Sequence, residues 1–191
     1  MAKQEEESKR LGARMIGMLS KLQRNSTPRD MTLSGIELGP IRAKILITNL
    51  VYNTSLSCLS MNRKLVEDEV GVDLARMLML NKHVRKLELE GNKLGPKTAK
   101  AFGDVLRHSK TMKFIDLDNN LLTSDGDDMT GLQYFIEGLK ENKSLLTLNM
   151  ANNRLDDQMG KCFVEALEVN KTLIDFEFGF NQFDVDTIRK I

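Results

Sequence analysis

The sequence has no tryptophan, two tyrosines, two histidines and two cysteines among its 191 residues. No stretch reaches the roughly 18 uncharged apolar residues that a membrane-spanning helix needs. The run Gln4-Glu-Glu-Glu7 interrupts the start of the chain, where a signal peptide would have its apolar region. The sequence therefore predicts neither a membrane span nor a secretory signal, and we expect a cytoplasmic protein.

Signals for catalysis and for cofactors are also missing. Cys58 and Cys162 lie far apart in the chain, and His83 and His108 occupy different repeats, so no nucleophile with a neighbouring base is predicted. The sequence has no glycine–lysine phosphate loop and no dinucleotide fingerprint. The two cysteines fit free thiols in a reducing compartment. We expect a protein that is not an enzyme and that binds no cofactor.

One pattern is repeated along the chain. Around Asn92 an apolar residue and two variable residues are followed by Leu-x-Leu-x-x-Asn-x-Leu, which ends at Leu94. The position of Asn92 recurs at residues 36, 64, 120, 153 and 181, so successive copies are 28 residues apart except for one step of 33. A register kept over six copies is typical of a repeat protein.

The two halves of each repeat have different periods. Leu87 and Leu89 alternate with charged residues, which predicts a short strand with one buried face. Residues 97–109 have helical spacing, and Asn92 stands at a turn, where its amide can bond backbone groups. One strand and one helix bury too little surface alone. We therefore expect stacked copies that form a right-handed α/β solenoid, or horseshoe, with parallel strands on the concave face and helices on the convex face.

The repeats predict a single domain over residues 1–191. Residues 3–25 match the helical half of a repeat and are expected to cap the N-terminal end of the core. Six repeat strands are expected within residues 28–183, and five inserted residues are expected in segment 123–131. The last repeat has no obvious cap before Ile191. Either more chain follows it, or another chain covers this C-terminal edge.

The 28-residue period, with a helix in every copy, resembles the ribonuclease-inhibitor-like subfamily of leucine-rich repeats. This subfamily includes ribonuclease inhibitor, the GTPase activator of Ran, and the actin-capping domain of tropomodulin. The run Gly138-Leu-Lys-Glu-Asn-Lys-Ser-Leu-Leu146 is similar to the helix-to-strand junctions of tropomodulin, a feature that much of the subfamily shares. The resemblance implies a binding surface rather than a reaction.

The outward side chains of the predicted strands form the candidate binding surface. The repeats place Glu88 and Glu90 next to Asp116 and Asp118, and opposed like charges cost stability. A protein that keeps this cost can use the charges to bind a basic partner, although an ordinary hydrophilic sheet face is also polar. We expect two phenylalanines near these carboxylates as apolar anchors. The candidate residues, which we call the concave patch, are Lys86, Glu88, Glu90, Phe114, Asp116, Asp118, Asn149, Asp175, Glu177 and Phe180.

The leading hypothesis is a non-enzymatic scaffold that binds a basic partner protein through the concave patch. The resemblance implies a cytoskeletal, axonemal or ciliary setting, and the inserted loop at 124–130 would be a secondary contact. Nucleic acid is not expected, because the surface is acidic and has no basic stripe. The alternative is a regulator of a small GTPase, like the Ran activator, which would stimulate GTP hydrolysis.

One segment imitates the start of a calcium loop. Asp116, Asp118 and Asn120 stand at alternate positions, and Asp127 stands at the twelfth position. The sixth position is Leu121 rather than the glycine that the turn of such a loop requires. We therefore predict no metal site in this segment.

Overall fold

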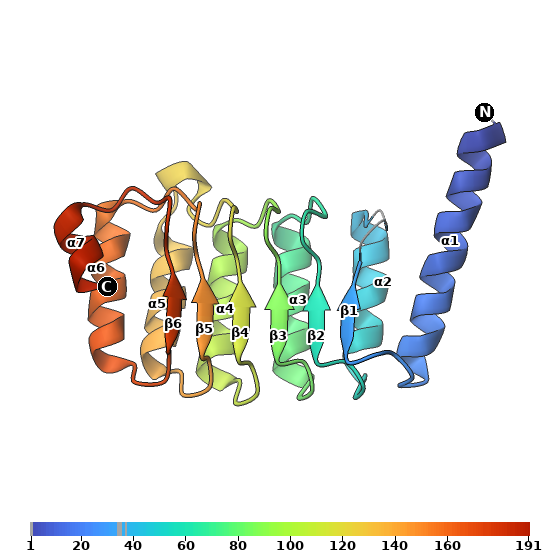
Figure 1. Cartoon of the computed structure of the whole chain (residues 1–191), viewed down its shortest axis with the longest axis horizontal. Coiled ribbons are helices and arrows are strands. Elements are labelled where there is room, and N and C mark those ends of the chain that lie inside the picture. The colour runs from blue at the N-terminus through green and yellow to red at the C-terminus, as the bar shows by residue number, and fades with distance from the viewer. Residues whose placement is uncertain (1, 34–35, 37) are drawn as a thin grey trace.

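A computed structural model describes residues 2–33, 36 and 38–191 of the chain. The strands are β1 (Asp30–Thr32), β2 (Cys58–Ser60), β3 (Lys86–Glu88), β4 (Phe114–Asp116), β5 (Thr147–Asn149) and β6 (Asp175–Glu177). The helices are α1 (Ala2–Gln23), α2 (Pro40–Leu50), α3 (Asp68–Leu80), α4 (Pro96–His108), α5 (Thr130–Glu141), α6 (Asp157–Val169) and α7 (Val185–Lys190). Strands and helices therefore alternate along the whole chain (Figure 1).

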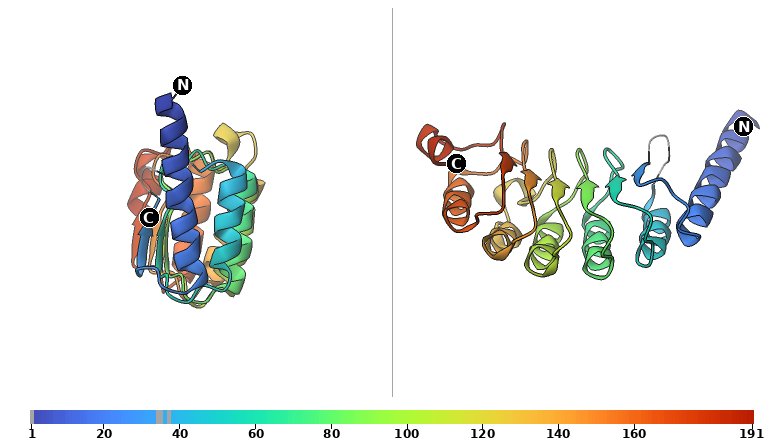
Figure 2. Two further views of the ribbon diagram at one scale, coloured as in Figure 1. Left: turned by 90° about the vertical axis from the view of Figure 1, so that its right-hand side faces the viewer. Right: turned by 60° about the horizontal axis from the view of Figure 1, so that its bottom comes forward.

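The six strands form one parallel sheet in chain order. Cys58 pairs with Lys86 and Lys86 pairs with Phe114, steps of 28 residues, whereas Phe114 pairs with Thr147 after 33. The helices lie on the outer side of a shallow arc and the strands on its inner side (Figure 2). This arrangement confirms the predicted fold class, an α/β solenoid with parallel strands on the concave face.

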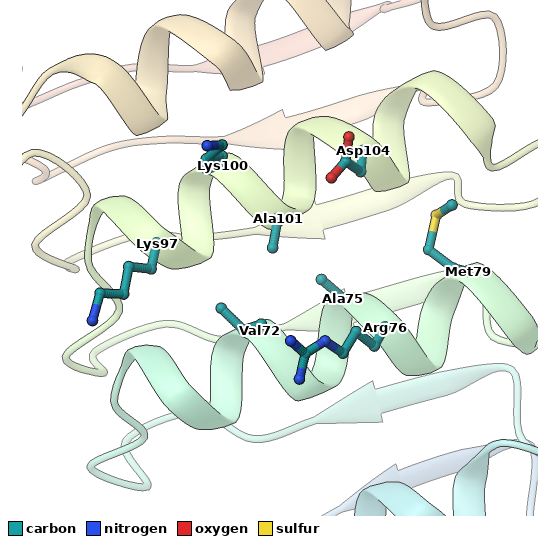
Figure 3. A pocket seen from close by; sticks show the side chains of 8 residues that line it. All are labelled: Val72, Ala75, Arg76, Met79, Lys97, Lys100, Ala101 and Asp104. Atoms are coloured by element: carbon teal, nitrogen blue, oxygen red, sulfur yellow. The ribbon is translucent and has the colours of Figure 1, made fainter.

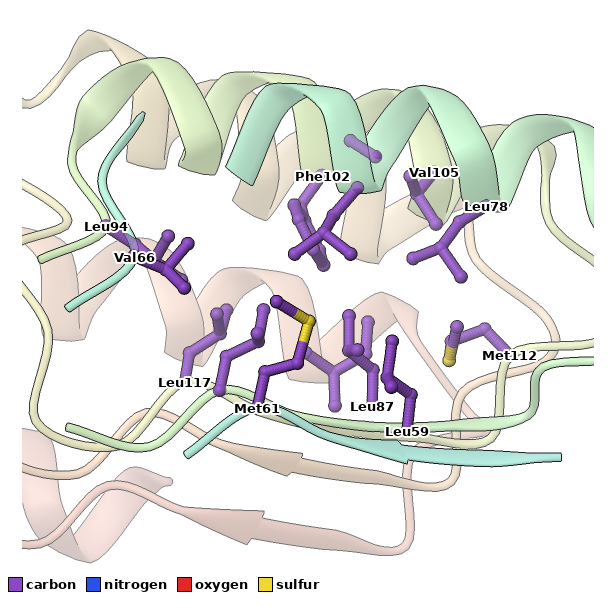
Figure 4. Close-up of a cluster of buried hydrophobic side chains, with 14 of the residues drawn as sticks. Leu59, Met61, Val66, Leu78, Leu87, Leu94, Phe102, Val105, Met112 and Leu117 are labelled. Atoms are coloured by element: carbon purple, nitrogen blue, oxygen red, sulfur yellow. The ribbon is translucent and has the colours of Figure 1, made fainter. Parts of the chain in front are cut away.

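The hydrophobic core lies between the sheet and the helices. Leu59, Leu87 and Leu117 rise from the strand side toward Phe102 and Val105 of α4, and all five are buried (Figure 4). Fully burying one such side chain contributes roughly 1.5–3 kcal/mol. Because equivalent residues stack from repeat to repeat, this layer continues along the solenoid and holds each strand in register with its neighbours.

Asn92 connects its own repeat to the preceding one. Its side-chain amide donates to the carbonyls of Met61, at 3.0 Å, and Leu89, at 2.8 Å. Its side-chain oxygen accepts from the backbone amides of Lys64, at 2.9 Å, and Val66, at 3.1 Å. The predicted role of this asparagine is confirmed. Equivalent amide-to-carbonyl bonds are made by Asn120, Asn153 and Asn181.

A second set of asparagines connects the repeats where each helix leads into the next strand. Asn53 donates to the Leu22 carbonyl at 2.8 Å, which ties the end of α1 to the first repeat. The same kind of bond joins Asn81 to Leu50, Asn142 to Leu106, and Asn170 to Leu139. Successive repeats are therefore cross-linked by buried hydrogen bonds at both ends of the strands.

Helices α4 and α5 approach each other at glycines. A Cβ added to Gly138 would lie 2.5 Å from the Gly103 carbonyl oxygen, and one added to Gly131 would lie 2.7 Å from the Pro96 carbonyl carbon. Real Cβ atoms do not approach backbone this closely, so only glycine fits at these two positions. The backbones of α4 and α5 are therefore in direct contact.

The inserted residues form a compact turn between β4 and α5. Its central part is the 3₁₀ helix η1 (Ser124–Gly126), in which Ser124 and Asp125 have φ values of 49° and 59°. The hydroxyl of Thr123 accepts from the Gly126 amide at 3.2 Å, and Asp125 pairs with Arg154 of the next repeat. These contacts anchor the turn. The proposed role of this loop as a secondary contact stays a prediction.

Candidate protein-interaction surface

The structure places the concave patch along one face of the sheet. Lys86 and Glu88 lie on β3, Phe114 and Asp116 lie on β4, and the pairing register sets Lys86 beside Phe114 and Glu88 beside Asp116. These four side chains are half-buried, because they alternate with the fully buried residues of the core. Asn149 follows on β5, Asp175 and Glu177 follow on β6, and Glu90 and Asp118 stand just beyond their strands.

Two of the four clustered carboxylates have cationic partners. The Lys86 ammonium lies 2.7 Å from a carboxylate oxygen of Glu88 on the same strand. The guanidinium of Arg63, in the preceding repeat, forms an ion pair with Glu90. Of the four like charges predicted on neighbouring strands, Glu88 and Glu90 are therefore paired with cations. A short β-strand presents alternate residues on the same side, so Lys86 can reach Glu88. Arg63 lies in the turn that follows β2, and this turn stands beside Glu90.

Asp116 is a half-buried carboxylate of the patch that lies close to other carboxylates. Its side chain accepts from the Asp118 amide at 3.0 Å, and among the described residues no cation lies within ion-pair distance of it. Burial first, and then the charges of Asp118, Glu90 and Glu88, raise the pKa of Asp116, although the amide bond opposes this shift. The negative charge of Asp116 is therefore kept at a cost to the free protein.

This cost predicts that Asp116→Asn stabilises the protein at neutral pH. Because the folded state raises the pKa of Asp116, it holds the proton more tightly than the unfolded state, and stability falls as the pH rises through that raised pKa. Asparagine removes this loss and can still accept from the Asp118 amide. Urea unfolding should show the variant more stable at pH 7, with the difference shrinking as the pH is lowered.

Asp128→Asn is the matched control. The hydroxyl and the amide of Thr130 donate to Asp128, at 2.6 and 3.0 Å, and these bonds lower the pKa of Asp128. The stability contributed by Asp128 is therefore present at neutral pH and lost as the pH falls. The two variants should change stability in opposite directions at pH 7. A less stable Asp116→Asn protein at that pH would contradict the account of Asp116.

The two aromatic anchors do not lie together. The ring of Phe114 is covered by the Lys86 ammonium at 4.4 Å, within the patch. Phe180 follows β6, which β5 separates from β4, so its predicted place beside the acidic cluster is corrected. Its side chain is 86% exposed, and its backbone has a φ of 58°. Phe180 stays in the patch only as a predicted outlying contact.

The side chains that surround the carboxylates include Asn62, which the repeat pattern places on the concave face, and two residues, Arg63 and Asn152, that sequence reasoning missed. Asn62 accepts from the Glu90 amide at 2.9 Å, and Asn152 donates to Asp118 at 2.8 Å. Arg63 and Asn152 occupy equivalent repeat positions, both with positive φ, at the turn just beyond each strand. Arg63 and Asn152 could have been found in the sequence, because each directly follows the last outward residue of its repeat.

The comparisons with known proteins fit this geometry. No family model matches the chain. Its sequence is similar to tropomodulin-4 of Bos taurus, with 26% identity over 112 residues that make up 58% of this chain and 31% of the relative. The chain thus spans about a third of the length of the tropomodulins that it matches.

Two solved structures share the fold. The tropomodulin C-terminal domain of Caenorhabditis elegans matches with a TM-score of 0.64 at 19% identity, over 78% of this chain and 87% of that one. The chain is a leucine-rich-repeat protein similar to tropomodulin. Actin-binding site 2 of leiomodin-1 matches with a TM-score of 0.55 at 16% identity, over 90% of this chain and 80% of that one. The resemblance to the leucine-rich repeats of tropomodulin is confirmed, and membership of the ribonuclease-inhibitor-like subfamily stays a prediction.

The two cysteines of the leucine-rich-repeat chain are partly buried. Cys58 lies beside the concave patch and Cys162 on α6, and both thiols are free. Burial first, and then nearby carboxylates, raise the pKa of both thiols, which leaves them protonated at neutral pH. Within the described ranges, no group of metal-binding side chains occurs and no helix has the length and apolar character to cross a bilayer.

The last repeat is less buried than the others. Leu173, Phe176 and Phe178 are only partly buried, whereas the equivalent residues of the inner repeats are fully enclosed. Ile174 and Val185 are exposed. That another chain covers this edge stays a prediction.

Proposed function

We propose that this leucine-rich-repeat protein is a scaffold of the actin cytoskeleton that binds a partner protein through the concave patch. Similarity to tropomodulin-4, and a fold shared with actin-binding site 2 of leiomodin-1, support the actin setting. The half-buried carboxylate of Asp116 carries the proposal for the surface, because the free protein keeps its charge at a cost. A partner that supplies a positive charge removes that cost.

The chemistry of the patch fits a basic side chain. Asp116 and Asp118 are the clustered carboxylates without an ion-pair partner among the described residues, so they can accept a guanidinium or an ammonium group. Phe114 lies on the same strand as Asp116, and an arginine of the partner can displace the Lys86 ammonium from its ring. The partner is therefore expected to insert an arginine or a lysine between β3 and β5.

The test is binding to actin with a charge-reversed variant. Wild type, Asp116→Lys/Asp118→Lys, and a control that carries the same charge change on the helical side, Glu69→Lys/Glu168→Lys, are compared by co-sedimentation with filaments and by titration of labelled monomers. We expect wild type and control to bind alike, and the patch variant to bind about tenfold more weakly or worse. Added salt should weaken wild-type binding.

Each failure has a separate meaning. If wild type binds neither form of actin, the actin setting is wrong. If the patch variant binds actin as well as wild type, the concave patch is the wrong surface. The alternative function, regulation of a small GTPase, predicts faster GTP hydrolysis by candidate GTPases, and stimulation in the absence of actin binding would favour it.

A further inference from the structure

The convex side of the solenoid carries a second candidate surface. An open groove of about 290 Å³ lies between α3 and α4, away from the sheet. Val72 and Ala75 of α3 face Ala101 of α4 across it, and Met79 lies at one end (Figure 3). Because the facing side chains are short, they do not fill the space between the two helices. The floor of the groove is therefore apolar and open.

The position of the groove follows from how α4 is held. On one side, glycine contacts at Gly131 and Gly138 fix α4 against α5. On the other side, α3 touches α4 closely at its first turn, where Gly71 packs against Thr98. Beyond that contact the alanines leave the interface unfilled. The width of the groove is thus set by the close contacts that hold α4 against α5 and against the first turn of α3.

The rim of the groove is basic. Arg76 stands on α3, and Lys97 and Lys100 stand on α4, whereas Asp104 is the one carboxylate in the lining. Asp104 is already engaged, because it accepts from the Tyr134 hydroxyl at 2.8 Å. Among the described residues, no carboxylate lies within ion-pair distance of Lys97. Arg76 already pairs with Asp73 at 3.1 Å, so the rim cations left without an ion pair among the described residues are Lys97 and Lys100.

The size and the charge of the groove select its occupant. Pockets for small molecules usually measure about 300–1,000 Å³ and enclose their ligand, whereas this groove is open and its volume of about 290 Å³ lies just below that range. It has room for one or two apolar side chains. An apolar floor with a basic rim is complementary to an amphipathic peptide that carries carboxylates beside its apolar face.

We propose that the α3–α4 groove docks a short acidic amphipathic helix from a partner protein. A large apolar side chain of that helix packs on Val72, Ala75 and Ala101. Its carboxylates pair with Lys97 and Lys100 of α4. The site lies on the side of the solenoid opposite the concave patch, so the two surfaces act independently.

The test begins with a displayed library of random 12-residue peptides, selected on the folded full-length chain. Selected peptides should combine leucine, phenylalanine or methionine with several aspartates or glutamates. Their affinity is then measured by fluorescence anisotropy against two variants. Ala101→Leu fills the floor without changing charge, and Lys97→Glu/Lys100→Glu reverses the rim. Each variant should weaken binding about tenfold or more.

Two controls make the result specific. Lys110→Glu/Lys143→Glu makes the same charge change at exposed lysines outside the groove, and Asp116→Lys/Asp118→Lys alters the concave patch. Both variants should bind the peptides as wild type does. The docking proposal can therefore fail while the proposed function of the concave patch holds, and the reverse is also possible. Circular dichroism should show Ala101→Leu folded and at least as stable as wild type, because the added side chain fills a partly buried gap.

Three outcomes would overturn the proposal. The selection yields no binding peptide, it yields basic or uncharged sequences, or the acidic peptides bind Ala101→Leu as tightly as wild type. Loss of binding in the groove variants, with both controls unchanged, supports it.

Discussion

Gly131→Ala is expected to lower the free energy of unfolding by about 3 kcal/mol or more, although it adds one methyl group. Gly131 lies in the first turn of α5, and its added Cβ would collide with the carbonyl oxygen and carbon of Pro96. These are backbone atoms, so no side-chain rotation can relieve the collision. To make room, α4 and α5 must move apart and lose the packing beneath them. Urea unfolding monitored by circular dichroism measures the change.

Gly17→Ala is the matched control for this prediction. Gly17 lies on α1, is exposed, and has no neighbouring atom within 4 Å of an added Cβ. Alanine is favoured over glycine inside a helix by about 0.8–1 kcal/mol, so this variant should be slightly more stable than wild type. The same chemical change is thus expected to act in opposite directions. If Gly131→Ala unfolds at the wild-type urea concentration, the close approach of α4 and α5 is wrong.

The repeat frame was predictable because it depends on local periodicity. Alternation at Leu87 and Leu89, the asparagine at position 92, and the step of 28 residues each follow from the order of residue types. One strand and one helix satisfy the frame in each copy, and stacking is the way for both to bury their apolar faces. The sheet order and the identity of the core residues follow from that argument.

The pairing of charges on the concave patch was not predictable in the same way. Arg63 reaches Glu90 from the turn of the preceding repeat, 27 residues away in sequence. The left-handed backbone of Arg63, whose φ is 55°, recurs at the equivalent positions Asn119 and Asn152, but only Arg63 places a cation there. Whether the side chain at this turn reaches a carboxylate of the next repeat depends on tertiary contacts, so the sequence indicates an acidic surface but not which of its charges remain unpaired.

The groove between α3 and α4 was also not predictable from the sequence, because it depends on how the helices pack. Alanines at 75 and 101 are ordinary helix residues in the sequence. They line a groove because the two positions face each other across an interface, while glycines at 131 and 138 hold α4 against its other neighbour. The distance between neighbouring helices comes from tertiary contacts, and a single repeat does not encode it.

Asn92→Ala should destabilise the protein by about 3–5 kcal/mol, since the side chain satisfies several buried backbone groups at once. The variant leaves the carbonyl of Met61, and the amides of Lys64 and Val66, without that partner, while the Leu89 carbonyl keeps its bond from Asn120. Asn92 is 6% exposed, so solvent cannot easily replace these bonds. The loss should appear as a lower urea midpoint.

The effect should be specific to the position of the asparagine. Asn49 lies on α2, where its amide bonds the Ile45 carbonyl at 2.8 Å within the same helix. Asn49→Ala should change stability by less than about 0.5 kcal/mol, because alanine suits a helix and that carbonyl already has a helical partner. Equal losses in the two variants would show that the bonds of Asn92 between repeats add nothing. A large loss at Asn92 alone would show that hydrogen bonds between turns, as well as the apolar core, hold β2 against β3 and so shape the concave patch.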